Sequence, residues 1–319
     1  MAALAAVYPA DGYRNPASWP RCAPLTPHLL ASCESEPDDG AASAQCASLL
    51  NMAAKYFYGR AAYAVARPLL ERALAIRERT LGPEHPDTAT SLHNLAESLW
   101  VANRPSEAEP LIRRALGIDE KSYGPDHPTV AIRLNNLAEL LRNTNRPSEA
   151  EPLIRRALAI SAKSLGPYHP SVAISLTVLA FLLKDTNRLS EAEPLFRRAL
   201  SILEISLGPD HPQVATGLGN LVRLLQTTNR QSEAEPLYRR ALAIDEKSLA
   251  PDHPDVAIRL NDLARLLRAT NRLGEAEPLL RRALSIFEKS LGADHPSTVT
   301  VRNNLSRLRP KKRMWWPWR

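Results

Sequence analysis

The sequence predicts an all-α fold, a right-handed α-solenoid of stacked helix-turn-helix units. The first observation is a repeat, because Gly-Pro-x-His-Pro recurs at residues 82, 124, 166 and 208 and returns in altered form at 250 and 292. The period is 42 residues without a slip, which is typical of repeat architectures. The second observation is that each unit carries two stripes of apolar residues at helical spacing. One helix pair cannot bury both stripes by itself, so neighbouring units are expected to stack.

The first helix of each unit is expected to follow the His-Pro pair. Pro128 suits a first helical turn, where the helix needs no backbone N–H, and His127 before it caps or flanks that turn. The apolar residues recur at i, i+3, i+6, i+7 and i+10, and in this unit they are Ala131, Leu134, Leu137, Ala138 and Leu141. This spacing places them on one face of the helix.

The second helix follows a Thr-Asn-Arg turn, and its apolar stripe in the same unit consists of Ala150, Leu153, Ile154, Ala157, Leu158 and Ile160. A serine three residues before a glutamate fits a capping box, and such pairs are Ser106 with Glu109, Ser148 with Glu151, Ser190 with Glu193 and Ser232 with Glu235. The alternative start is Pro147, which would place Pro152 inside the helix and bend it slightly.

The repeat divides the chain into three parts. A helix-pair array is predicted over residues 45–309, and it consists of a divergent first repeat at 45–81, five 42-residue repeats at 82–291 and a terminal half repeat at 292–309. Residues 1–44 are rich in Pro, Ala and Ser and carry an acidic patch, so a largely unordered leader is expected there. Residues 310–319 form a basic, Trp-rich tail.

These strings resemble the tetratricopeptide repeats of the kinesin light chain type. The resemblance is carried by Gly-Pro-Asp-His-Pro, by Leu-Asn-Asn-Leu-Ala and by Glu-Ala-Glu-Pro-Leu-x-Arg-Arg-Ala-Leu, and it covers about residues 45–309. The heptad segment with which that family engages a motor heavy chain has no counterpart in residues 1–44. The resemblance therefore implies the fold and not a motor subunit.

The resemblance also implies a concave groove, lined by first helices, in which asparagines bond the backbone of an extended peptide. The matching positions here are Asn94, Asn135, Asn136, Asn220, Asn261, Asn303 and Asn304. An asparagine side chain suits a peptide backbone because it offers both a donor and an acceptor. Thr177 and Val178 interrupt the series. The alternative is that some of these asparagines only tie adjacent helices together.

Charged residues follow the asparagines on the same helix face. One turn on, the row reads Glu97, Glu139, Phe181, Arg223, Arg265 and Arg307, and the next turn reads Trp100, Arg142, Lys184, Gln226 and Arg268. The groove is thus predicted to carry both acidic and basic residues at its start and mainly basic residues from the middle onward. Guanidinium groups bind carboxylates bidentately, so an acidic partner segment is expected. The alternative is that these arginines are merely solvated.

Two other repeated features are expected to be structural. The Arg-Arg pairs of the second helices, at 113/114, 155/156, 197/198, 239/240 and 281/282, each begin four residues after a glutamate, which predicts an ion-paired outer face rather than a nucleic-acid stripe. Six of the eight histidines stand at repeat starts. Equivalent positions of stacked helices lie on the order of 10 Å apart, too far for one zinc ion, so no metal site is expected.

Composition narrows the class of protein. The chain has 319 residues and a net charge of +7, with 41 Lys and Arg against 34 Asp and Glu. Its cysteines, Cys22, Cys33 and Cys46, all lie near the start, which excludes a disulfide scaffold.

No apolar run reaches the roughly 20 residues of a membrane span, so a cytoplasmic protein is expected. Phosphate loops, nucleophile elbows and zinc-protease motifs do not occur in the sequence, and neither an enzyme nor a cofactor is predicted.

The tail differs in kind from the array. Residues 307–319 contain six basic residues, no acidic ones and three tryptophans. They could cover the end of the last helix as a lid or remain disordered, contact a membrane surface, or stack on single-stranded nucleic acid. The residues of such a contact would be Lys311, Lys312, Arg313, Trp315, Trp316 and Trp318.

The leading hypothesis is a noncatalytic interaction scaffold that binds extended, acidic segments of a protein partner in the groove. The alternative hypothesis is peripheral membrane or nucleic-acid association through the tail.

Overall fold

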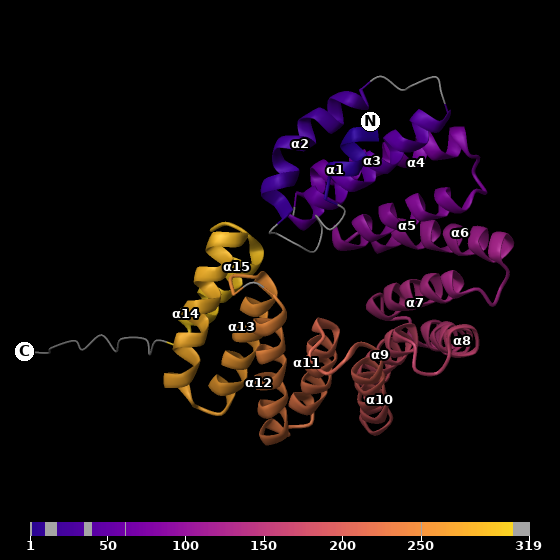
Figure 1. Cartoon of the computed structure of the whole chain (residues 1–319). Helices are drawn as coiled ribbons and strands as arrows, with labels where there is room; N and C mark the ends of the chain where they lie inside the picture. Colours follow the sequence, from indigo (N-terminus) through magenta and orange to yellow (C-terminus); the bar gives the residue numbers. More distant parts are fainter. Residues whose placement is uncertain (1, 10–17, 35–39, 61, 250, 309–319) are drawn as a thin grey trace, which may run out of the picture. The chain divides into compact units, whose positions relative to one another are not determined.

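The computed structural model describes residues 2–9, 18–34, 40–60, 62–249 and 251–308, and the elements in these ranges are all α-helices (Figure 1). The chain divides into two compact units, Met1–Ser206 and Leu207–Arg319. The predicted fold class, an all-α solenoid of stacked helix pairs, is confirmed.

The first unit consists of successive antiparallel helix pairs preceded by two further helices. Its elements are α1 (Ala2–Val7), α2 (Trp19–Ser32), α3 (Gly40–Gly59), α4 (Tyr63–Thr80), α5 (Pro86–Val101), α6 (Pro105–Tyr123), α7 (Pro128–Asn143), α8 (Pro147–Leu165), α9 (Pro170–Asp185) and α10 (Leu189–Leu207). Helix α3 packs on α4, α5 on α6 and α7 on α8, while α4 contacts α5, α6 contacts α7 and α8 contacts α9. Each repeat therefore packs on the next.

The second unit repeats this arrangement. Its elements are α11 (Pro212–Thr227), α12 (Gln231–Ser248), α13 (Pro254–Ala269), α14 (Leu273–Ser290) and α15 (Pro296–Ser306). Helices α11 and α12 form one pair, α13 and α14 form the next, and α15 packs on α14.

The repeated histidines cap the first helices, as the sequence predicts. In each case the imidazole Nδ1 accepts a hydrogen bond from the backbone N–H two residues further on, and proline follows the histidine at the first helical position. In α7 the distance from Thr129 N to His127 Nδ1 is 3.2 Å. This bond satisfies one of the four backbone donors that a helix leaves open at its start.

The Asn of the turn between the two helices has its own structural role. Asn103, Asn145, Asn187, Asn229 and Asn271 all have φ between 59° and 62°, a left-handed conformation that asparagine tolerates better than most residues. The following Arg146 N donates to Leu141 O at 2.8 Å, which is the six-to-one bond of a Schellman cap. The turn thus ends the first helix and reverses the chain.

The predicted capping boxes at the second helices are wrong. Helix α8 starts at Pro147 with Arg146 at its N-cap, and no side chain caps it. Glu151, assigned to the box, instead bonds the guanidinium groups of Arg155 and Arg188 at 2.6 and 2.8 Å. Hydrogen bonds between two ionised groups are roughly twice as strong as neutral ones, so the arginines hold this carboxylate.

The predicted unordered leader is corrected for its described residues, because α1 and α2 fold against α3. Cys22, Leu29, Cys33 and Cys46 are fully buried in one core, and Tyr8 Oη lies 2.9 Å from the buried Thr26 Oγ1. The Ala, Pro and Ser content conceals a helical stripe at 22, 26, 29 and 33. Helix α3, on which they fold, begins at Gly40, five residues before the predicted start of the array.

The ion-paired outer face is confirmed. Each predicted glutamate–arginine pair four residues apart forms, as in Glu109 with Arg113 at 2.7 Å. The structure adds pairs between repeats, since Arg146 reaches back to Glu109 at 2.5 Å as well as to Glu149 in its own repeat at 2.7 Å. The arginine of the turn therefore connects successive second helices.

A buried ion pair joins two repeats at one fixed position. Asp119 of α6 and Arg133 of α7 lie 2.8 Å apart with 1% and 7% of their side chains exposed, and the Asp119 Oδ1 atom makes no hydrogen bond in the described chain. Asp245 and Arg259 repeat this pair in the second unit at 2.9 Å. Other repeats place different residues at the two positions, namely Arg77 with Ser91, Ser161 with Ser175, Leu203 with Gly217, and Phe287 with Val301. The position thus accepts either a charged or an apolar pair.

We expect a single substitution of this pair to destabilise the fold and a matched double substitution to leave its stability nearly unchanged. Asp119→Ala leaves Arg133 buried without its partner and should lower the free energy of unfolding by about 3–5 kcal/mol. The double variant Asp119→Phe with Arg133→Val copies the apolar pair Phe287 and Val301 and should fold with near-normal stability. Urea unfolding followed by circular dichroism tests this, and a double variant as unstable as the single one would contradict it.

Candidate functional site

The candidate site is the face of the first helices, which is built from two neighbouring positions in each repeat. We call them the first and second ladder positions. The first is held by Asn51, His93, Asn135, Thr177, Gly219, Asn261 and Asn303. The second is held by Met52, Asn94, Asn136, Val178, Asn220, Asp262 and Asn304.

The ladder positions bond to each other between repeats. Asn94 Nδ2 donates to Asn51 Oδ1 at 3.1 Å, and Asn304 Nδ2 donates to Asn261 Oδ1 at 2.8 Å in the second unit. In each case the second position donates to the first position of the preceding repeat, 43 residues earlier. These contacts support the alternative interpretation, in which asparagines tie adjacent helices together.

Val178 breaks this ladder and leaves a buried acceptor behind. Asn135 is 6% exposed, and its Nδ2 donates to Ser175 Oγ at 2.9 Å. Its Oδ1 has no hydrogen-bond partner within the described structure, because valine stands where other repeats have the donating asparagine. Of the remaining predicted asparagines, Asn220 is half-buried on α11 and Asn303 is exposed on α15. Ligand binding by the asparagines stays a prediction.

His93 occupies the first ladder position of α5 as a neutral side chain. Burial lowers the pKa of its imidazole to about 4, and the positive charges of Arg133 and Lys55 act in the same direction. Asn136 Nδ2 lies 3.5 Å from His93 Nδ1, which fits an imidazole that accepts from the amide. The sequence did not single out this histidine, because it stands outside the repeated His-Pro string.

The basic residues predicted for the first unit are compensated there. Arg142 Nη1 lies 3.4 Å from Asp185 Oδ2, its guanidinium stacks 5.2 Å from the Phe181 ring centre, and 14% of its side chain is exposed. Lys184 Nζ lies 3.2 Å from Asp185 Oδ1. Asp185, the last residue of α9, was not among the predicted site residues, although it directly follows Lys184.

The second unit presents its arginines around one carboxylate. Arg265 Nη1 lies 3.7 Å from Asp262 Oδ1. Burial raises the pKa of Asp262, while the positive charges of Arg265, Arg259 and Arg223 oppose that shift. Arg223 and Arg265 are exposed, and Arg268 is half-buried. Arginines are therefore present on this face, with the carboxylate of Asp262 beside Arg265, and ligand binding by them stays a prediction.

Arg259 is a further residue that the sequence analysis missed. Its Nε lies 2.9 Å from Asp245 Oδ2, and its guanidinium crosses to α11, where Nη2 lies 3.4 Å from Thr216 Oγ1. A Cβ atom on Gly219 would lie 2.6 Å from Arg259 Nη1. The glycine at this first ladder position therefore makes room for the arginine.

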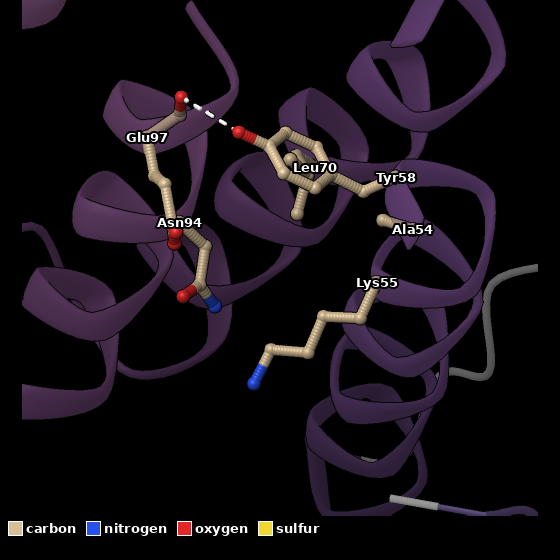
Figure 2. Close-up of a pocket in the computed structure, with 6 residues that line it drawn as sticks. All are labelled: Ala54, Lys55, Tyr58, Leu70, Asn94 and Glu97. Atoms are coloured by element: carbon tan, nitrogen blue, oxygen red, sulfur yellow. Dashed lines mark hydrogen bonds between the residues drawn. The ribbon is translucent and has the colours of Figure 1, made fainter. Parts of the chain in front are cut away.

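In each unit a cavity opens beside the ladder. The first, of about 40 Å³, lies between α3, α4 and α5 and is drawn in Figure 2; its lining residues are Ala54, Lys55, Tyr58, Leu70, Asn94 and Glu97. The second, of about 230 Å³, is lined by residues of α13, α14 and α15 that include Ile258, Phe287 and Val301. Lys55 and Tyr58 were not among the predicted site residues, because the first repeat diverges in sequence. They correspond to Glu97 and Trp100 of the next repeat.

The proposed tail contacts, Lys311, Lys312, Arg313, Trp315, Trp316 and Trp318, lie outside the described residues. Among the helices that the structure describes, none combines the length and apolar character that a membrane span requires.

Comparison with known proteins places the repeats in a family. The family model described as tetratricopeptide repeat matches at residues 45–121, 104–163, 134–205, 194–247, 233–289 and 260–309. No curated protein matches the chain.

Solved structures of similar fold agree with that family. Nearly identical TPR-like repeats of a kinesin light chain-like protein from Podosopora anserina are 28% identical over 65% of this chain and 98% of theirs, with a TM-score of 0.53. BtubC (BKLC) from P. vanneervenii is 22% identical over 74% and 92%, with a TM-score of 0.55. A Rap protein complexed with Competence and Sporulation Factor is 15% identical over 90% and 82%, with a TM-score of 0.60.

Val178→Asn should complete the ladder. The new amide can donate to the buried Asn135 Oδ1, and a bond to an otherwise unsatisfied group should raise the free energy of unfolding by about 1 kcal/mol. Val178→Asp is the matched control, because it has nearly the same shape but its carboxylate cannot donate. Urea unfolding compares the two variants, and equal stabilities would contradict the assigned hydrogen bond.

His93 should make the protein acid-sensitive. The imidazole has a pKa near 6.5 in the unfolded chain and about 4 in the folded chain. Between these two pH values the unfolded chain therefore binds a proton that the folded chain does not bind. Stability should fall as the pH drops, by about 2 kcal/mol at pH 5. His93→Asn, which copies the residue of other repeats, should remove this loss while leaving that of the half-buried His295, whose pKa burial also lowers. Unfolding midpoints at pH 7 and 5 test this, and an unchanged pH dependence would refute it.

Proposed function

The chain belongs to the tetratricopeptide repeat family, and from that premise we propose that it is a noncatalytic protein–protein interaction scaffold that binds extended, acidic segments of a partner. The proposal assigns the acidic segment to the first-helix face of the second unit, around Arg223, Arg265 and Arg268. The fold itself is typical of protein–protein interaction, and the choice of an acidic ligand comes from the charges on that face.

The observation that carries the proposal is the excess of arginine in this unit. The two rows that follow its ladder positions hold Arg223, Arg265 and Arg268, and the charges of Arg223 and Arg265 act on the carboxylate of Asp262. Arg265 keeps 48% of its side chain exposed, so its guanidinium can still receive a ligand carboxylate in bidentate form. An extended acidic strand laid across α11 and α13 would offset the remaining positive charge.

The first unit is a weaker place for an acidic ligand. Arg142 and Lys184, which the sequence grouped with the later arginines, both lie against Asp185. Glu97 and Glu139 stand on the same face. A ligand carboxylate there would meet acidic side chains instead of an excess of positive charge.

The structural neighbours support a binding role in a general way. The Rap protein with this fold was solved in complex with Competence and Sporulation Factor. For the present chain, the partner is proposed by its chemistry alone, as a protein or peptide with acidic residues at alternate positions of an extended segment.

Charge-reversing substitutions should show whether the peptide binds the first-helix face or the outer face. The double variant Arg265→Glu with Arg268→Glu should weaken binding of a fluorescein-labelled peptide with four alternate glutamates by at least tenfold, which corresponds to about 1.4 kcal/mol. Arg281→Glu with Arg282→Glu on α14 is the matched control, because it also reverses two arginines and both lie in ion pairs of the outer face. Fluorescence anisotropy at two salt concentrations measures the affinity.

Equal loss in the control variant would show that net charge, and not this face, attracts the peptide. Unchanged affinity in the double variant would overturn the proposal.

A further inference from the structure

We propose that the cavity between α3, α4 and α5 is a second, separate recognition site. It binds an aliphatic side chain of a partner segment that carries Lys or Arg two residues further along. This inference rests on the proposed peptide-binding role of the first-helix face and adds a ligand class opposite in charge to that of the second unit. The partner chemistry follows from the floor, the rim and the neighbouring carboxylates of the cavity.

The floor of the cavity is apolar and held in place. Ala54 and Leu70 are almost fully buried and form its base. Figure 2 shows the Tyr58 ring beside Leu70, with its hydroxyl donating to the backbone carbonyl of Glu97 at 3.4 Å. The ring also meets Tyr63 edge to face at 5.1 Å between centroids. A cavity of about 40 Å³ with such walls suits a small aliphatic group and is largely formed before binding.

The two helices that frame the cavity are tied to each other. Asn94 of α5 bonds Asn51 of α3 through the ladder, at 3.1 Å, and Asn94 also lines the cavity. This bond keeps the rim residues Lys55 and Glu97 on opposite sides, as Figure 2 shows. Since the walls are already in place, binding needs little ordering of the protein.

The charges beyond the cavity favour a basic residue in the ligand. Glu97 of α5 and Glu139 of α7 are equivalent residues of adjacent repeats. Burial raises the pKa of Glu139, and the charge of Glu97 raises it further, so the two carboxylates act on each other. The Arg142 guanidinium is 3.9 Å from Glu139 and closer, at 3.4 Å, to Asp185. A ligand cation near both glutamates would be favoured on charge.

The geometry of an extended strand sets the spacing. Alternate residues of a strand point to the same side and lie about 6.6 Å apart, while packed helices lie about 8–10 Å apart. When an aliphatic ligand residue occupies the cavity, the ligand residue two positions later therefore lies in the direction of α7. A long Lys or Arg side chain spans the remaining distance to Glu139.

Three labelled peptides test the inference on the full-length protein. They share one Gly-Ser background and carry Leu-Ser-Arg, Leu-Ser-Glu or Ser-Ser-Arg at their centre. The first should bind at least tenfold more tightly than either of the others in fluorescence anisotropy. Equal binding of all three peptides, or preference for Leu-Ser-Glu, would overturn the inference.

Variants of the protein test separately the preference for Leu over Ser and the preference for Arg over Glu. Glu97→Gln with Glu139→Gln should remove the preference for Arg over Glu at the third position, whereas Glu149→Gln on the outer face should keep it. Ala54→Leu should fill the cavity and remove the preference for Leu over Ser. Because Ala54 is buried, Lys55→Glu on the exposed rim is a second variant, and it should strengthen binding of Leu-Ser-Arg.

The outcome is separable from that of the proposed function. Arg265→Glu with Arg268→Glu should leave binding of Leu-Ser-Arg unchanged, and the glutamine variants should leave binding of the acidic peptide unchanged. If the acidic peptide alone binds, the inference fails and the proposed function stands. If sedimentation shows a dimer that the glutamine variants dissociate, while no peptide binds, a second copy of the chain occupies the site and the inference fails.

Discussion

Each helix pair in this chain depends on its neighbour to complete its core. Leu116 of α6 packs into the cluster that Val130 and Ala157 form in the next repeat, and Leu74 of α4 does the same one repeat earlier. Full burial of a leucine side chain contributes about 1.5–3 kcal/mol, and the partly buried Leu116 and Leu74 gain a share of this stabilisation only when the following pair is present. Stability therefore accumulates along each unit through contacts between neighbours.

Polar contacts between repeats follow from the same dependence. Stacking brings the ladder amides and the turn arginines next to residues about one repeat away in the sequence, and it brings Asp119 of one repeat next to Arg133 of the following repeat. Buried polar groups need partners, so each substitution in one repeat requires a matching one in the next. The unpaired oxygen of Asn135 marks the place where Val178 does not meet that requirement.

The first-helix faces of the two units differ in charge although the repeats are nearly alike. In the second unit Arg223, Arg265 and Arg268 outnumber the carboxylate of Asp262. In the first unit Asp185 neutralises the basic residues, and Glu97 and Glu139 stand beside an apolar cavity. Side chains at a few equivalent positions can therefore direct different partner segments to different repeats of one fold.

The sequence by itself determined the helix pairs, their 42-residue period, the histidine caps and the paired outer face, because each depends on residues close in the chain or on exact repetition. Only the tertiary structure showed that α1 and α2 fold on α3, that glutamates bond arginines instead of capping helices, and that asparagines bond between repeats. Those outcomes depend on which side chains of different helices meet. A sequence pattern specifies the face on which a side chain lies, but stacking decides which partner it reaches.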